Sequence, residues 1–169
     1  TPTVTPVPGV GTGLQVMPGT QPANYIAPEN AARVPFTVVK LTAGTDGDVT
    51  VSGITVERTG PAADTSFDGV VLLDENMAQL GIAKTLNSSH QTVVGDPFVV
   101  KAGQTRTMTI AANMDSDLDG EAGQVASFSV NSINTSATVS GSLPITGAAH
   151  TINGTLSIGS VTVARGALD

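Results

Sequence analysis

Apolar residues recur at every second position through most of this chain, and this period restricts the possible folds more than any other feature. Met108, Ile110 and Ala112 alternate with Thr or Ala, and residues 126–131 alternate apolar and polar side chains in the same way. Successive side chains of a β-strand point to opposite faces, so such a segment buries one face and presents hydroxyl groups on the other. No segment carries a convincing helical stripe. The alternation therefore predicts an all-β fold.

Turn-forming residues interrupt the alternating segments at short intervals. Gly, Pro, Asn and Asp favour turns because they supply positive φ, a fixed φ or local hydrogen bonds. The spacing predicts about ten strands in an antiparallel β-sandwich of immunoglobulin-like or jelly-roll-like type, forming a single domain over residues 14–169. The turn signals are Asp46-Gly47, Gly60-Pro61, Gly95-Asp96-Pro97, Ala102-Gly103, Asp119-Gly120 and Asn153-Gly154.

Local details of the strands follow from the same pattern. The apolar parity changes across Ser52-Gly53 and across Gly159-Ser160, which predicts a β-bulge at each place. Asn153-Gly154 predicts a two-residue hairpin turn over residues 151–156. Thr109 is expected on the half-exposed face of its strand. The residues predicted to face inward are Phe36, Val38, Val51, Val56, Val71, Leu73, Phe98, Met108, Ile110, Phe128, Val130, Val139 and Ile158.

Composition excludes several classes of function. The chain has no Cys, so thiolate catalysis and cysteine metal clusters are impossible. Its net charge of -7 gives no basic surface for nucleic acid. No run of about 18 apolar residues is present, so membrane insertion is not expected. Charged residues make up only 12% of the chain, and low charge with Thr-rich strands is common in secreted all-β proteins, so we expect an extracellular or cell-surface location.

Residues 1–13 read TPTVTPVPGVGTG and differ from the rest of the chain. Pro fixes φ and lacks a backbone donor, so this segment is predicted to be an extended arm or linker. At about 3.1 Å per residue it reaches roughly 40 Å. Deletion of residues 1–17 is expected to leave a foldable chain. The candidate residues for contact with a neighbouring copy are Val4, Val7, Val10, Leu14 and Val16.

An acidic segment offers a candidate calcium site. Asp115, Asp117 and Asp119 alternate before Gly120, as in the first half of a calcium-binding loop. The distal Glu of such a loop is missing, so only Glu121 or Asn113 could complete the ligand set. Calcium binding by Asp115, Asp117, Asp119 and Glu121 therefore competes with a simple solvated hairpin loop.

Two further motifs concern the cell surface. Residues 143–147 read LPITG, the sortase sorting pentapeptide, but an alternating segment follows instead of an apolar stretch and a basic tail. An edge strand or bulge is the better interpretation, because Pro is tolerated there. Asn87, Asn134 and Asn153 each begin a glycosylation sequon, but a chain so rich in Ser and Thr produces nearly as many by chance, so the sequons carry little weight. Glycans remain a possible partner beside copies of the chain itself.

No catalytic constellation is visible. His90 and His150 are the only histidines, lie sixty residues apart and are expected on the surface. The carboxylate pairs lie in turn-rich stretches, and aromatic residues make up only 3% of the chain. We therefore predict no enzyme activity, no catalytic residues and no cofactor other than possible calcium.

Five segments follow one another in a characteristic order: VPFTVVKLTAG (34–44), GDVTVSGITVERTG (47–60), DGVVLLD (68–74), VKAGQTRTMTIAAN (100–113) and LPITG (143–147). This order resembles a repeat module of large secreted surface-layer or filament proteins of uncultivated small-genome bacteria. This resemblance implies an Ig-like sandwich used as a building block, with LPITG belonging to the module. It offers no catalytic residues to carry over.

The sequence thus favours an extracellular structural subunit that forms a homopolymer by β-strand addition through its N-terminal arm. The alternative is a calcium-stabilised adhesion or carbohydrate-binding module. A hydrolase with carboxylates on loops is the least supported interpretation.

Overall fold

The computed structural model describes residues 13–157 and confirms the all-β sandwich. Thirteen strands are present in this part, against about ten expected, and one 3-10 turn covers Asp64–Ser66. The strands are β1 (Leu14–Pro18), β2 (Ile26–Glu29), β3 (Val34–Ala43), β4 (Val49–Thr59), β5 (Phe67–Leu73), β6 (Gln79–Lys84), β7 (Gln91–Val94), β8 (Phe98–Val100), β9 (Thr105–Met114), β10 (Val125–Thr135), β11 (Val139–Gly141), β12 (Ile145–Thr146) and β13 (His150–Ser157).

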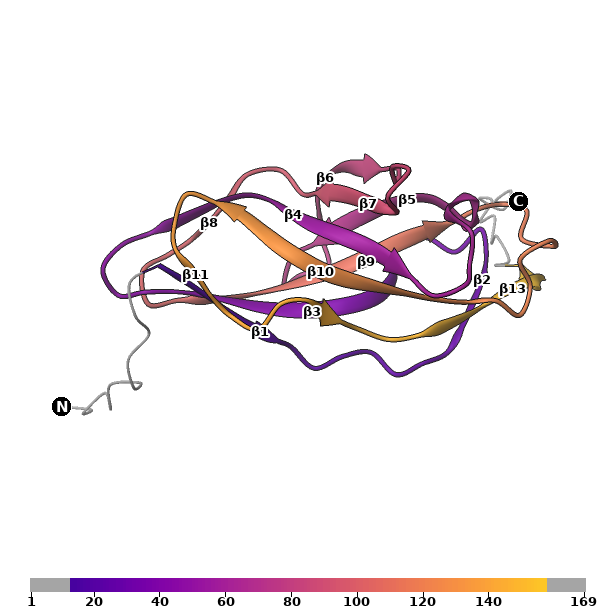
Figure 1. The fold of residues 1–169 in the computed structure, drawn as a ribbon, viewed down its shortest axis with the longest axis horizontal. Coiled ribbons are helices and arrows are strands. Elements are labelled where there is room, and N and C mark those ends of the chain that lie inside the picture. Colours follow the sequence, from indigo (N-terminus) through magenta and orange to yellow (C-terminus); the bar gives the residue numbers. More distant parts are fainter. Residues whose placement is uncertain (1–12, 158–169) are drawn as a thin grey trace, which may run out of the picture.

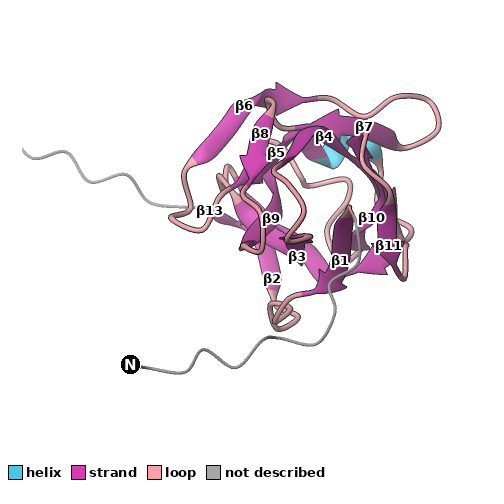
Figure 2. Ribbon diagram, turned by 90° about the vertical axis from the view of Figure 1, so that its left-hand side faces the viewer, coloured by secondary structure: helices cyan, strands magenta, loops and turns pink. Residues whose placement is uncertain are grey.

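Two sheets enclose the core between them, as the view along the long axis shows (Figure 2). The first sheet has the order β11-β1-β3-β9-β5-β6, and the second has the order β2-β13-β10-β4-β7. β12 and β8 pair with parts of β10 and β4. Most strand pairs are antiparallel, as expected, and two are parallel: β1 with β11 and β2 with β13.

Aromatic rings fill the centre of the sandwich. The Phe36 ring lies edge-on to Phe128 and Phe67, with centroid distances of 4.9 Å and 6.1 Å. This geometry places the positive edge of one ring against the negative face of another. Eight residues predicted to face inward are confirmed as buried: Phe36, Val51, Val56, Phe98, Met108, Ile110, Phe128 and Val130.

The prediction for Val38 is wrong, and a bulge explains why. The register between β3 and β9 shifts between Pro35 and Thr37. Beyond this shift the inward parity of β3 changes, so Val39 enters the core while Val38 is only half-buried. Pro35 lacks a backbone donor, which fits a break in the ladder at this point.

The prediction that Val71 and Leu73 of β5 face the main core is wrong. Val70 and Leu72 belong to the main core, whereas Val71 and Leu73 are buried with Ala111 in a second, smaller cluster. Since successive side chains alternate, this cluster lies on the opposite face of the sheet. Thr109 is 7% exposed rather than half-exposed. Val139 is half-buried against the core, and Ile158 lies outside the described residues.

The two predicted bulges and the predicted hairpin have different outcomes. Asn134 pairs with Gly53 and Thr135 with Val51, so Ser52 is the extra residue and the bulge at Ser52-Gly53 is confirmed. Residues 159–160 lie outside the described part of the chain.

The predicted hairpin at Asn153-Gly154 is wrong, because both residues lie within β13. The Asn153 side chain instead accepts hydrogen bonds from the backbone N–H groups of Thr155 and Leu156. A Cβ on Gly154 would lie 2.7 Å from the backbone of Leu118. Gly154 therefore serves a close backbone approach and not a turn.

The ends of the sandwich carry different strands. β11 lies toward one end of the long axis, and β2 and β13 lie at the other (Figure 1). β1 starts beside β11, because its first residue, Leu14, pairs with Val139. The N-terminal segment therefore joins the sandwich at the end opposite β2 and β13.

Candidate functional site

β1 carries two of the five candidate assembly residues. It pairs antiparallel with β3 and parallel with β11, and its Leu14 and Val16 side chains are each only 1% exposed. The structure thus places these two residues in the core of their own chain. The other three candidates, Val4, Val7 and Val10, lie outside the described residues.

Backbone hydrogen bonds fix the point where the N-terminal segment enters the fold. The Leu14 N–H donates to the Thr138 carbonyl, and the Gly44 N–H donates to the Gly13 carbonyl, each at 2.8 Å. Gly13 has φ of 106°, and a Cβ there would lie 2.2 Å from the Thr138 oxygen. Only Gly fits both the conformation and the space at this position.

The structure does not bring the four calcium candidates together. The Asp115 carboxylate accepts a hydrogen bond from the Asp117 N–H at 2.9 Å, and the Asp117 carboxylate accepts one from the Asp119 N–H at 3.4 Å. These side chains stabilise local turns. Within residues 13–157, no group of three His, Cys, Asp or Glu side chains, Glu121 included, is placed to hold a metal ion.

The LPITG segment is part of the sandwich. Ile145 is buried and pairs with Val130, while the Thr146 hydroxyl lies 2.6 Å from that of Ser129. The Gly147 N–H donates to the Phe128 carbonyl at 3.3 Å. These contacts hold the Thr-Gly bond against β10, in agreement with its interpretation as an edge strand.

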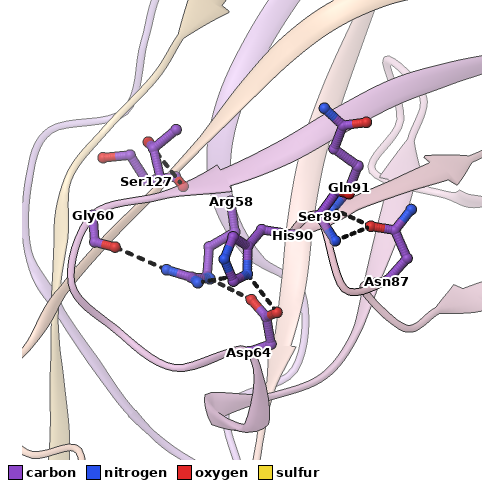
Figure 3. Close-up of polar contacts among 9 residues, drawn as sticks. Arg58, Gly60, Asp64, Asn87, Ser89, His90, Gln91 and Ser127 are labelled. Carbon is purple, nitrogen blue, oxygen red and sulfur yellow. Dashed lines mark hydrogen bonds and ion pairs between the residues drawn. The ribbon is translucent and has the colours of Figure 1, made fainter.

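A cluster of Arg58, Asp64 and His90 was not visible in the sequence (Figure 3). Arg58 Nε donates to one Asp64 oxygen at 2.5 Å, and His90 Nδ1 lies 2.7 Å from the other. Burial would raise the pKa of Asp64, but the hydrogen bonds from His90 and Arg58 outweigh it and leave the pKa below its usual value. The cluster joins the end of β4 to the turn before β7.

A second polar group lies on the outer face of the second sheet. One Glu57 oxygen accepts hydrogen bonds from Gln91 at 2.8 Å and Asn131 at 2.6 Å, and both lower the pKa of Glu57. An open cleft of about 390 Å³ adjoins this carboxylate. It is lined by Glu57, Thr59, Ser129, Asn131, Leu143 and Pro144.

An aromatic stack connects the core to the surface at the β2 end. The His150 ring lies 4.5 Å from the Phe36 ring and 3.9 Å from the Tyr25 ring, measured between centroids. His150 is fully buried, so its predicted surface position is wrong. The sequence did contain one indication of this burial. His150 lies two residues before Ile152, which also faces the core, and residues two apart in a strand share a face.

Comparisons with known proteins assign the chain to no family. No protein-family model matches the chain, and no curated protein matches it. In the part of the chain that the structure describes, no helix is long and apolar enough to cross a membrane. A functional interpretation therefore depends on the strands, the polar groups and the sheet edges described above.

Proposed function

We propose that this chain is an extracellular, non-catalytic structural subunit that assembles with copies of itself into a filament or surface layer. The observation that carries this proposal is the separation of two features along the sandwich. The N-terminal segment joins at the β11 end, whereas the edge strand β2 lies at the opposite end (Figure 1). When the segment at one end of a copy binds an acceptor at the opposite end of the next copy, the contacts between copies are head-to-tail.

The burial of Leu14 and Val16 limits the segment that can reach a neighbour. Both side chains are needed in their own core, so residues 1–12 are the part left for intermolecular contact. This segment carries Val4, Val7 and Val10 and no charged residue, so it brings no like charge to a chain with net charge -7.

The mode of contact that we propose is addition of this extended segment to an open sheet edge of the next copy. Among the described residues, the edge strands are β11 and β6 in the first sheet and β2 and β7 in the second. Edge strands offer unpaired backbone groups that can bind another extended chain. Repetition of a head-to-tail contact gives a fibre when the rotation between copies does not close a ring.

Truncation at the entry point tests the proposal. The full chain and a variant lacking residues 1–12 are compared by sedimentation and negative-stain microscopy, with melting temperature as the control for folding. The full chain should form elongated assemblies, and the truncated chain should stay monomeric with the same melting temperature, because β1 is retained. Two monomeric proteins, or two that assemble equally, would contradict the proposal.

The cleft beside Glu57 favours a second candidate function, carbohydrate binding. The ionised carboxylate, the Asn131 amide and the Ser129 and Thr59 hydroxyls offer acceptors and donors for sugar hydroxyls, and Leu143 and Pro144 offer an apolar wall. Titration with N-acetylglucosamine at roughly millimolar concentration, followed by amide NMR shifts, tests it. Shifts around Asn131 that Glu57→Gln abolishes would support it, and their absence would exclude it for this sugar.

A further inference from the structure

The outer face of the second sheet carries two open clefts along β4. Thr55, Glu57 and Thr59 alternate with buried residues of β4, so their side chains share this face. The cleft of about 390 Å³ described above, which we call the Glu57 cleft, includes Glu57 and Thr59. A second cleft of about 270 Å³, the Gln91 cleft, includes the third of these residues and is lined by Thr55, Thr85, Asn87, Gln91, Thr92 and Val93.

A hydrogen-bonded pair joins the two clefts. Glu57 and Gln91 are directly opposite each other on β4 and β7, and Gln91 Nε2 donates to Glu57 Oε2 at 2.8 Å. One residue of the pair lines each cleft, so the pair forms their common boundary. Thr59 and Thr55 lie roughly 13 Å apart along β4, at about 3.3 Å per residue. A single sugar is shorter than this span, whereas a chain of sugars can reach both clefts.

The turn that forms one wall of the Gln91 cleft is held in place (Figure 3). Asn87 Oδ1 accepts hydrogen bonds from the backbone N–H groups of Ser89 and Gln91 at 2.8 Å and 3.0 Å. The backbone N–H of Arg58 donates to the His90 carbonyl at 2.8 Å, which ties the same turn to β4. A wall fixed in this way loses little conformational freedom when a ligand binds.

The chemistry of the two clefts selects a class of sugar. Glu57 is the only charged residue among those that line them, and the others are mainly hydroxyl and amide side chains, which suit sugar hydroxyls. Gln91 and Asn131 both donate to Glu57 Oε2, which leaves Oε1 to accept from a ligand. An ammonium group makes the stronger, charge-assisted bond with a carboxylate. The net charge of -7 disfavours sugars that carry carboxylate or phosphate groups.

We propose that the two clefts form one binding track for an oligosaccharide of amino sugars, with an ammonium group of the ligand on Glu57. This inference rests on the carbohydrate-binding function proposed above and names its ligand. The sugar hydroxyls bond to the amides and hydroxyls on both sides of Glu57. Leu143 and Pro144 at one end, and Val93 at the other, contact the apolar faces of the sugar rings.

A series of ligands tests the preference for amino groups. The full chain is titrated calorimetrically, at mildly acidic pH, with tetramers of β-1,4-linked glucosamine and of N-acetylglucosamine and with monomeric glucosamine. We expect the glucosamine tetramer to bind about 10-fold more tightly than either of the other two. Glu57→Gln should weaken the glucosamine tetramer more than the N-acetylated one, because only the former loses a charge pair. Equal affinities of the two tetramers for the parent chain would overturn the role of the amino group.

Matched substitutions test the use of the second cleft. Val93 and Val99 are 44% and 39% exposed on the outer face of the second sheet, but only Val93 lines one of the two clefts. Val93→Lys and Val99→Lys change the net charge equally, and both should keep the melting temperature of the parent. We expect Val93→Lys to weaken the glucosamine tetramer by about 10-fold and Val99→Lys to leave its affinity unchanged. Equal effects of the two substitutions would overturn the track.

The outcomes separate this inference from the carbohydrate-binding function on which it rests. If monomer and tetramer bind equally and Val93→Lys has no effect, the track is wrong and sugar binding at the Glu57 cleft stands. If no sugar binds, both fail, whereas the structural role of the chain is tested separately by its assembly. A tetralysine peptide that binds as tightly as the glucosamine tetramer would show that any cationic chain is accepted and would overturn the assignment to sugars.

Discussion

His150 Nε2 lies 2.8 Å from the carbonyl oxygen of Pro35, and this contact assigns the proton of a buried imidazole. A carbonyl oxygen can only accept, so Nε2 donates, while Nδ1 accepts from the Tyr25 N–H at 3.2 Å. The ring is therefore neutral. Burial lowers the pKa of His150, and the hydrogen bonds with Pro35 and Tyr25 oppose this shift without reversing it.

We predict that this histidine makes stability depend on pH. An unfolded His titrates near pH 6.5, whereas the folded pKa lies lower. Between the two values the unfolded chain binds more protons, so the contribution is fully present above about pH 6.5 and declines as pH falls toward the folded pKa. Urea unfolding between about pH 7.5 and 5 should show this decline in the parent and a smaller one in His150→Gln.

The half-exposed His90 provides the control for that measurement. His90→Gln removes the other histidine of the chain and should retain the decline with pH. If the parent and His150→Gln show the same slope, His150 is not the group responsible.

Deleting β1 should destabilise the fold, contrary to the expectation from the sequence that residues 1–17 are dispensable. Complete burial of Leu14 and Val16 contributes roughly 1.5–3 kcal/mol for each side chain. β3 and β11 also lose their shared partner. Thermal unfolding should give parent-like values for a chain starting at Gly13 and a much lower melting temperature for one starting at Gly19. A peptide of residues 13–19 should restore part of the loss, and equal melting temperatures would contradict this role of β1.

Replacement of Phe128 tests the assignment of the core. Its ring is fully buried between Phe36 and Phe67, so Phe128→Ala should cost about 3–5 kcal/mol. Ser132 is exposed on the same strand, and Ser132→Ala should stay within about 0.5 kcal/mol. Thr109 is too buried to serve as this control. Equilibrium unfolding in urea measures both changes, and similar losses would show that the inward face of β10 is wrongly assigned.

A pair of glycines tests the close packing beside β12. A Cβ on Gly147 would lie 2.0 Å from the Phe36 carbonyl oxygen and 2.6 Å from the Thr37 Cα, so the backbone must move. Gly147→Ala should therefore destabilise the fold by about 1–3 kcal/mol, as overpacking does. A Cβ on Gly120 meets nothing within 4 Å, so Gly120→Ala should be neutral or slightly stabilising. Chemical unfolding of the two variants measures the difference, and a neutral Gly147→Ala would exclude the close contact.

The sequence by itself determined the class of the fold and much of its core. Alternation is a local property, so the apolar parity of β9 and β10 correctly placed Met108, Ile110, Phe128 and Val130 in the core. The bulge at Ser52-Gly53 is equally local, because the parity change is visible within one strand.

The tertiary structure alone decided the features that depend on pairing between distant segments. In β5 four consecutive apolar residues hide the parity, so only packing shows that Val70 and Leu72 face the main core. The ring of Tyr25, the residue before β2, stacks on His150, and these two residues lie 125 positions apart in the sequence. The period of a strand fixes which side chains share a face, but it carries no information about what covers that face.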